Sequence, residues 1–301
     1  MPARSRLALA FVLTTLVAAL EFAGGAISHS LALTTDAVHM CMDVFGLAIA
    51  LAAAIGATRR ANRRKTFGYG RLEVLGAMIN GSLLLGASAV IAYEAVMRFH
   101  EPSHPHGMLM TAFAAVGLLA NLTSAAFLRQ HTHHRHHHRH EHDLNVRAAI
   151  VHVAGDALAS FAVIIGGLLI AWTGAVWLDP ALSLFVAALV VAGVAGVIRD
   201  AGDVLLEGSP PGIDVGDVER RIESIAGVSA VHDLHVWSIG SSSPALSAHL
   251  LLDEGRLLEG PRIIAQLRDE VRSRFGIDHV TIQLESEHCD PGGIVICRPD
   301  Q

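Results

Sequence analysis

Long apolar stretches separated by short polar segments dominate the first part of the 301-residue chain. Six of them cover residues 7–27, 31–58, 72–99, 108–128, 145–172 and 176–198. Each is long enough to cross a hydrocarbon core of about 30 Å, which takes about 20 helical residues. The pattern predicts a transmembrane domain of six helices over residues 1–200. The first stretch is too long for a signal peptide, so we expect it to be retained as the first span.

The pattern changes after Arg199, where apolar runs become shorter and alternate with polar residues. Helical periodicity covers residues 214–225 and 261–275, whereas residues 228–237, 245–252 and 279–284 alternate as strands do. An α-β-β-α-β order of this size is typical of a small ferredoxin-like α/β domain. We therefore predict a second domain over residues 201–301.

Basic residues collect in alternate loops between the apolar stretches. They are Arg4, Arg6, Arg59, Arg60, Arg63, Arg64, Lys65, Arg129, Arg135, Arg139 and Arg199. The opposite loops are nearly free of Lys and Arg, with Arg98 as the exception. Short basic loops stay in the cytosol, so both termini and the α/β domain are predicted to be cytosolic.

Composition supports a membrane protein with a soluble part, since 52% of the residues are hydrophobic and 17% are charged. Soluble domains contain about 25% charged residues. Three scattered cysteines form neither a disulfide framework nor a CxxC motif. The formal charge of -6 argues against nucleic acid as a partner.

Two apolar stretches each contain a histidine followed four residues later by an aspartate: His39 with Asp43, and His152 with Asp156. This spacing puts both side chains on one face of a helix. A single His–Asp pair would equally well be a hydrogen-bonded structural pair. Ionisable residues inside spans, however, usually mark an ion or proton pathway. Repetition in two spans favours a shared metal site.

Two imidazoles and two carboxylates suit the tetrahedral coordination of Zn²⁺, with Cd²⁺, Co²⁺ or Fe²⁺ as alternatives. These ligands bind metal only when deprotonated, so metal and protons compete for them. No span contains an HExxH motif, and no nucleophile arrangement is present. The sequence therefore predicts a transporter and not an enzyme.

Two further regions are rich in possible ligands. Between spans four and five, the loop over residues 129–143 contains His131, His133, His134, His136, His137, His138, His140 and His142. Such tracts are compositional signals of metal binding, and a merely solubilising loop is the alternative. In the predicted α/β domain, His232, His235, His249, Asp278, His279, Glu285 and His288 lie on or beside strands. Singly these are typical surface residues, but together they are candidates for a cytosolic metal site.

Taken in order, several segments of the chain resemble the cation diffusion facilitator family of zinc transporters. They are residues 28–33 (SHSLAL), 36–43 (DAVHMCMD), 67–73 (FGYGRLE), 152–156 (HVAGD), 179–180 (DP), 232–238 (HDLHVWS) and 281–285 (TIQLE). The resemblance implies a homodimer in the plasma (inner) membrane that exports a divalent metal from the cytosol in exchange for protons. The HxxxD form of both helical motifs resembles the zinc-preferring branch.

Carried over to this sequence, the resemblance implies a transport site of His39, Asp43, His152 and Asp156. It also implies a dimer-stabilising zinc site of His232, His249 and Glu285, completed by Asp278 or His279. In some members a further metal binds in the loop between spans two and three, but Asn62, Lys65 and Tyr69 occupy the matching positions here. That third site is therefore expected to be absent.

Two other classes of function compete with the transporter. An integral-membrane metalloenzyme would need an open ligand position and a substrate pocket. A membrane metal sensor would use zinc-dependent rearrangement of the cytosolic domains without transport.

Overall fold

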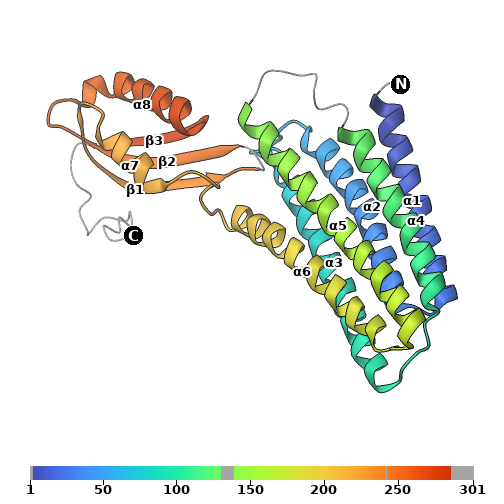
Figure 1. Cartoon of the computed structure of the whole chain (residues 1–301). Coiled ribbons are helices and arrows are strands. Elements are labelled where there is room, and N and C mark those ends of the chain that lie inside the picture. The colour runs from blue at the N-terminus through green and yellow to red at the C-terminus, as the bar shows by residue number, and fades with distance from the viewer. Residues whose placement is uncertain (1–2, 130–138, 241–242, 286–301) are drawn as a thin grey trace. The chain divides into compact units, whose positions relative to one another are not determined.

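The computed structural model describes residues 3–129, 139–240 and 243–285, and its first part is entirely helical (Figure 1). The side chains of residues 3–11, 13, 14, 121, 124–129 and 139–154 lie outside the description. The helices are α1 (Ala3–Ser28), α2 (Leu31–Ala57), α3 (Arg71–His100), α4 (Gly107–Arg129), α5 (Arg139–Thr173) and α6 (Leu178–Leu205).

The apolar character of these helices fits the hydrocarbon core, where every backbone polar group needs an internal partner. Among the described residues, α2, α3, the Gly155–Thr173 part of α5, and α6 are long and apolar enough to span a membrane. The described apolar parts of α1 and α4, Thr15–Ser28 and Gly107–Ala120, are shorter. A helical transmembrane domain is thus confirmed.

The turn between α5 and α6 differs slightly from the prediction, because α6 begins at Leu178 and not at residue 176. Gly174 has a φ of 68°, and its N–H donates to the Ile170 carbonyl, which ends α5. Pro180 lies in the first turn of α6, where a missing N–H costs nothing. At its other end α6 continues to Leu205, beyond the predicted end at residue 198.

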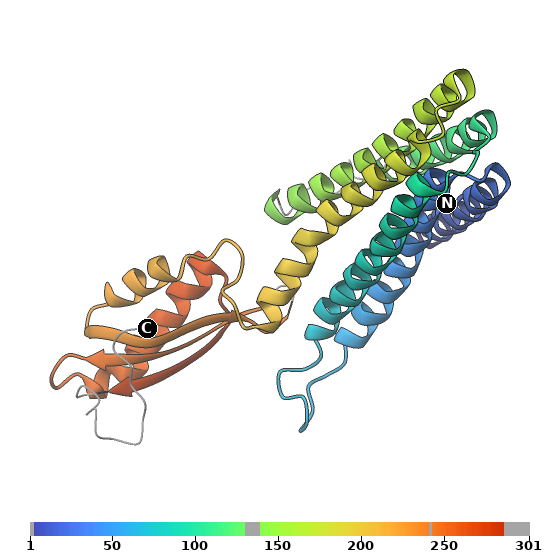
Figure 2. The same ribbon diagram turned by 90° about the horizontal axis from the view of Figure 1, so that it is seen from below.

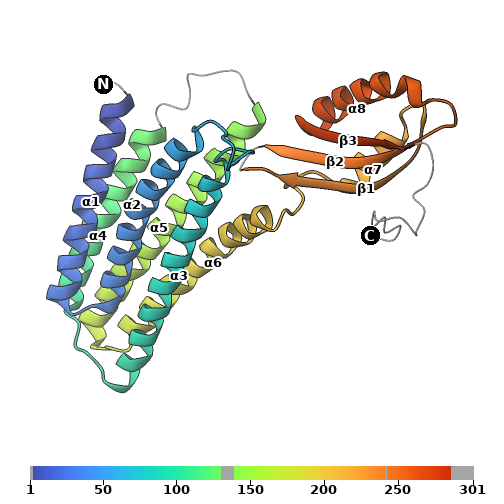
Figure 3. The same cartoon turned by 180° about the vertical axis from the view of Figure 1, so that it is seen from behind.

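The chain divides into two compact units, residues 1–50 with 79–198, and residues 51–78 with 199–301. In the first unit the helices run side by side (Figure 3). Among the described residues of this unit, the larger buried cluster joins Leu33 of α2, Met110 of α4, Val163 of α5 and Val186 of α6, all fully buried.

The second unit contains a three-stranded sheet and two helices. Its elements are α7 (Val215–Glu223), β1 (Val228–Ser238), β2 (Pro244–Leu252), α8 (Gly260–Phe275) and β3 (His279–Glu285), with a 3-10 turn at Leu257–Glu259 before α8. The strand order is β1-β2-β3, with β1 antiparallel and β3 parallel to β2. Both helices cover the same face of the sheet (Figure 2). The predicted α-β-β-α-β order is confirmed.

Local chemistry explains where the helices of this unit begin and end. The Asp214 side chain accepts hydrogen bonds from the backbone N–H groups of Gly216 and Asp217, which caps the N-terminus of α7. Gly276 adopts the left-handed conformation, with a φ of 69°, and ends α8.

Alternation along the strands decides which side chains face the helices. Leu250 of β2 and Leu284 of β3 belong to the core under the helices, so their neighbours His249 and Glu285 project from the opposite face. In β1 the pairing with β2 shifts between His232 and His235. Asp233 lies in this bulge with a φ of 51°.

Candidate metal centres

The first candidate centre begins on α2, where His39 and Asp43 lie one turn apart. The His39 Nε2 atom is 3.6 Å from the Asp43 Oδ2 atom. Both side chains are partly buried, with 13% and 26% of their surface exposed. The local 3.6-residue period of the helix is sufficient to bring them together, as the sequence predicts.

Helix α5 brings the third member of this centre. The Asp156 Oδ1 atom lies 3.3 Å from the His39 Nε2 atom, across an interval of 117 residues. Ligand atoms of His39, Asp43 and Asp156 all lie within 4.8 Å of one another, close enough to bind one ion. His152 is one turn before Asp156 on α5, but its side chain lies outside the described residues.

A second hydrogen bond joins the two helices beside this cluster. The Ser160 Oγ atom donates to the Asp36 Oδ2 atom at 2.9 Å, and both residues are buried. Asp36 lies one turn before His39, and Ser160 one turn after Asp156. The bond therefore connects α2 and α5 next to their ligand atoms.

The side of His39 that faces α3 and α6 borders a small, mostly apolar pocket. Its lining includes Thr35 of α2, Leu84 and Ser88 of α3, and Val190 of α6. Of the three candidate ligands described, His39 is the one that lines this pocket.

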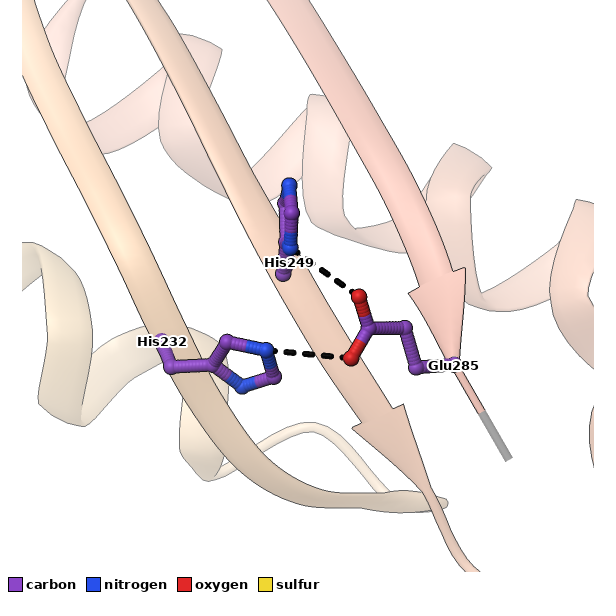
Figure 4. A group of neighbouring side chains, drawn as sticks. All are labelled: His232, His249 and Glu285. Atoms are coloured by element: carbon purple, nitrogen blue, oxygen red, sulfur yellow. Dashed lines mark ion pairs between the residues drawn. The ribbon is translucent and has the colours of Figure 1, made fainter. Parts of the chain in front are cut away.

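The second candidate centre lies in the α/β unit, on the sheet face away from the helices (Figure 4). His232 of β1 and His249 of β2 are cross-strand partners, and their ring centroids are 5.4 Å apart. The Glu285 carboxylate at the end of β3 lies between them. Its Oε2 atom is 3.0 Å from His232 Nε2, and its Oε1 atom is 3.0 Å from His249 Nδ1.

The donor set of this second centre fits a divalent metal. His232 Nε2 and His249 Nδ1 are buried, and within the described part of the chain neither has a partner in hydrogen-bond geometry, although both are close to the carboxylate. Buried polar atoms normally have such partners. Two imidazole nitrogens and a carboxylate oxygen suit Zn²⁺, which takes a fourth ligand in a tetrahedral site.

Asp278 and His279 are not brought to this centre. His279 is the first residue of β3, six residues before Glu285, which is about 20 Å along an extended strand, and Asp278 directly precedes it. The Asp278 Oδ1 atom instead pairs with Arg272 Nε at 2.9 Å. The His279 ring packs edge-on against the Phe67 ring, with their centroids 5.5 Å apart.

Asp233 is a neighbour of this centre that sequence reasoning did not select. Its Oδ2 atom is 3.6 Å from His249 Nε2, and its Oδ1 atom is 3.0 Å from His235 Nε2. The bulge that turns Asp233 toward His249 has no clear signal in the sequence. His235 therefore lies beside Asp233 and not in the three-residue cluster.

The loop between α2 and α3 is closed by its own hydrogen bonds. Asn62 Nδ2 donates to the Tyr69 hydroxyl at 2.8 Å, and Asn62 Oδ1 accepts from the backbone N–H groups of Arg64 and Lys65. The candidate ligands of the histidine-rich loop, together with His288, lie outside the described residues.

Comparison with known proteins covers almost the whole chain. Residues 7–206 match the cation efflux transmembrane domain, and residues 210–287 match the cytoplasmic domain of cation efflux proteins.

Three relatives illustrate the similarity over nearly the full length of the chain. The cadmium, cobalt and zinc/H(+)-K(+) antiporter of Bacillus subtilis (strain 168) is 38% identical over 97% of this chain and 92% of its own. The zinc transporter ZitB of Escherichia coli (strain K12) is 38% identical over 94% of this chain and 88% of its own. The metal cation efflux system protein CzcD of Cupriavidus metallidurans is 36% identical over 95% of this chain and 87% of its own.

A solved structure, the metal-bound C-terminal domain of the CzcD transporter from the same organism, is 32% identical. It covers 24% of this chain and 99% of its own, with a TM-score of 0.23.

Proposed function

The chain belongs to the cation efflux family, and from this premise we propose that it exports Zn²⁺ from the cytosol in exchange for protons. Metal cation efflux is common to its relatives, which are transporters and not enzymes. Cd²⁺, Co²⁺ and Fe²⁺ are secondary candidates for the substrate.

One observation carries the proposal. His39, Asp43 and Asp156 gather their ligand atoms within 4.8 Å of one another on two apolar helices. With His152 as the fourth ligand, two nitrogens and two oxygens would form the tetrahedral shell that zinc favours. Ions with a preference for oxygen, such as Mn²⁺ and Ca²⁺, suit this donor set less well.

Proton exchange follows from the same atoms. Imidazole and carboxylate groups bind metal only when deprotonated, so protonation of the site expels the ion and metal binding expels protons. A site that faces each side of the membrane in turn would thereby couple zinc export to proton entry.

In the cytosolic domain we assign a structural or regulatory Zn²⁺ to His232, His249 and Glu285. The two buried ring nitrogens that face Glu285 without hydrogen-bond geometry support this assignment. The metal would stabilise a homodimer. The basic loops support an orientation with both termini in the cytosol, in the plasma (inner) membrane.

Zinc flux into liposomes with an imposed pH gradient tests the proposal. Purified wild-type protein is expected to move zinc with an opposite movement of protons, recorded by a dye inside the vesicles. Asp43→Ala removes a ligand and should abolish both signals. Asp200→Ala is the matched control, because it removes an exposed carboxylate outside both centres and should leave flux unchanged.

The outcome separates the competing functions. Zinc flux without any proton movement would overturn the exchange mechanism. Zinc binding with no flux in the wild-type protein would favour a metal sensor that acts through its cytosolic domain.

A further inference from the structure

The first turn of α2 is held by a carboxylate from another helix. Asp179 of α6 has no exposed side-chain surface. Its Oδ2 atom accepts a hydrogen bond from the Leu31 N–H at 2.7 Å, and its Oδ1 atom accepts from the Ala32 N–H at 3.1 Å. Oδ1 also accepts from the Ser30 hydroxyl at 2.6 Å. Three donors at the start of α2 therefore converge on one side chain.

This arrangement goes beyond an ordinary helix cap. The first N–H groups of a helix have no partner within it, and the preceding residue usually supplies one. Ser30 does so here, because its Oγ atom accepts from the Leu33 N–H at 3.1 Å while its own proton goes to Asp179. Asp179 thus accepts hydrogen bonds from two further N–H groups, those of Leu31 and Ala32, although it lies 148 and 147 residues further along the chain.

Helix α3 holds the same turn. An Nη1 atom of Arg98 lies 3.5 Å from Asp179 Oδ2 and donates to the His29 carbonyl at 2.9 Å. His29 has a φ of 54°, a conformation that is uncommon for residues other than glycine. The α1–α2 turn is therefore fixed from both α3 and α6.

We propose that Asp179 is a positioning residue for the transport site, because it sets the placement of α2 and hence the direction of His39 and Asp43. His39 lies about two turns, or about 12 Å, beyond the capped turn. Between them Asp36 bonds to Ser160 of α5. Without the cap at its first turn, α2 would lose the contact that fixes its start on α6, and the placement of His39 toward Asp156 would depend on contacts further along the helix, such as the Asp36–Ser160 bond. This inference rests on the proposed function.

The substitution Asp179→Asn tests the proposal in the full chain. An asparagine side chain has nearly the same shape but presents an NH₂ group to one set of donors, which leaves buried N–H groups without an acceptor. We expect a roughly tenfold loss of zinc affinity at the transport site. Isothermal titration in detergent measures it in a His249→Ala background, which removes the cytosolic centre. The isotherm of a protein that also carries Asp43→Ala serves as the reference. The heat that this isotherm lacks is assigned to binding at the transport site.

Val186→Ala is the matched control for a merely structural role. Val186 is a fully buried core residue two turns further along α6, so its truncation loses packing and removes no polar contact with α2. It should lower the thermal unfolding temperature and leave zinc affinity unchanged. Ser30→Ala is the milder second variant, since it removes one of the three donors to Asp179 and the acceptor of the Leu33 N–H but leaves both backbone bonds to Asp179 in place. It should reduce affinity by a smaller factor.

Three results would overturn the inference. The first is a zinc affinity equal to that of the wild type in Asp179→Asn. If Asp179→Asn does not fold, the same result in Ser30→Ala counts instead. The second is an equal loss of affinity in Val186→Ala. The third is full zinc binding in Asp43→Ala, which would refute the transport site itself and so the proposed function along with this inference.

Discussion

At the scale of single residues, the contact between His39 and Asp156 joins two distant parts of the chain in one site. We predict that Asp156→Ala abolishes zinc flux, because it removes the only described ligand from α5. The loss in zinc affinity should exceed the roughly 10–100-fold cost of losing a residue that only supports a ligand. Isothermal titration measures the zinc affinity, and the liposome assay measures the zinc flux. Flux near the wild-type rate would remove Asp156 from the site.

The Asp36–Ser160 hydrogen bond is a second residue-scale link. Ser160→Ala leaves the buried Asp36 carboxylate without this donor, which costs about 1–3 kcal/mol. We expect a lower unfolding temperature together with weaker zinc binding. Ser183→Ala is the control, since this equally buried serine donates only to the Asp179 carbonyl of its own helix. Similar zinc affinities in the two variants would show that the link does not support the site.

At the scale of elements, glycines allow α4 and α5 to approach closely. A Cβ atom at Gly107 would collide with the Gly167 carbonyl oxygen and lie 2.6 Å from the Ala171 nitrogen. Because these are backbone atoms, Gly107→Ala must push the helices apart. Overpacking of this kind costs about 1–3 kcal/mol.

Thermal unfolding in detergent measures the effect of Gly107→Ala. Gly193→Ala on α6 provides the comparison, since its Cβ would meet no atom within 4 Å in the described structure. That change should be neutral or slightly stabilising. Equal unfolding temperatures for the two variants would contradict the close approach of α4 and α5.

Helices α7 and α8 are joined by an ion pair whose strength depends on pH. Arg221 donates from Nε to Glu270 Oε2 at 2.9 Å, and this hydrogen bond lowers the pKa of Glu270. A lowered pKa means that the pair stabilises the folded state above the ordinary glutamate pKa of about 4.3. This stabilisation is lost as the pH falls through the lowered value.

We therefore predict that Glu270→Gln slightly lowers the unfolding temperature at pH 7, since surface pairs contribute little. The difference from wild type should shrink as the buffer is acidified below pH about 4. Unfolding scans of both proteins across this range provide the measurement. A difference that grows on acidification would refute the assignment.

At the scale of the whole molecule, the cytosolic centre is predicted to couple zinc to dimer formation. Zinc should strengthen the homodimer in detergent, and His249→Ala should remove that effect. Analytical ultracentrifugation with and without a chelator measures the dissociation of the homodimer into protomers. His104→Ala, at an exposed histidine outside both centres, should respond to zinc as the wild type does.

Local pattern alone was sufficient for much of this protein. Apolar runs and strand alternation predicted the helices and strands to within a few residues at most boundaries, because helical and strand periods are properties of neighbouring residues. The same periodicity placed His39 with Asp43 on one face of a helix. The histidine–aspartate repeat and the order of the motifs also determined the family.

Contacts between distant segments were decided only by the tertiary structure. Packing of α2 against α5 brings Asp156 to His39, and the pairing of three strands brings Glu285 to His232 and His249 while it leaves Asp278 and His279 at the far end of β3. The bulge at Asp233 and the cap by Asp179 also belong to this level. Periodicity fixes the face on which a side chain lies, whereas the partner of that face depends on how the whole core packs.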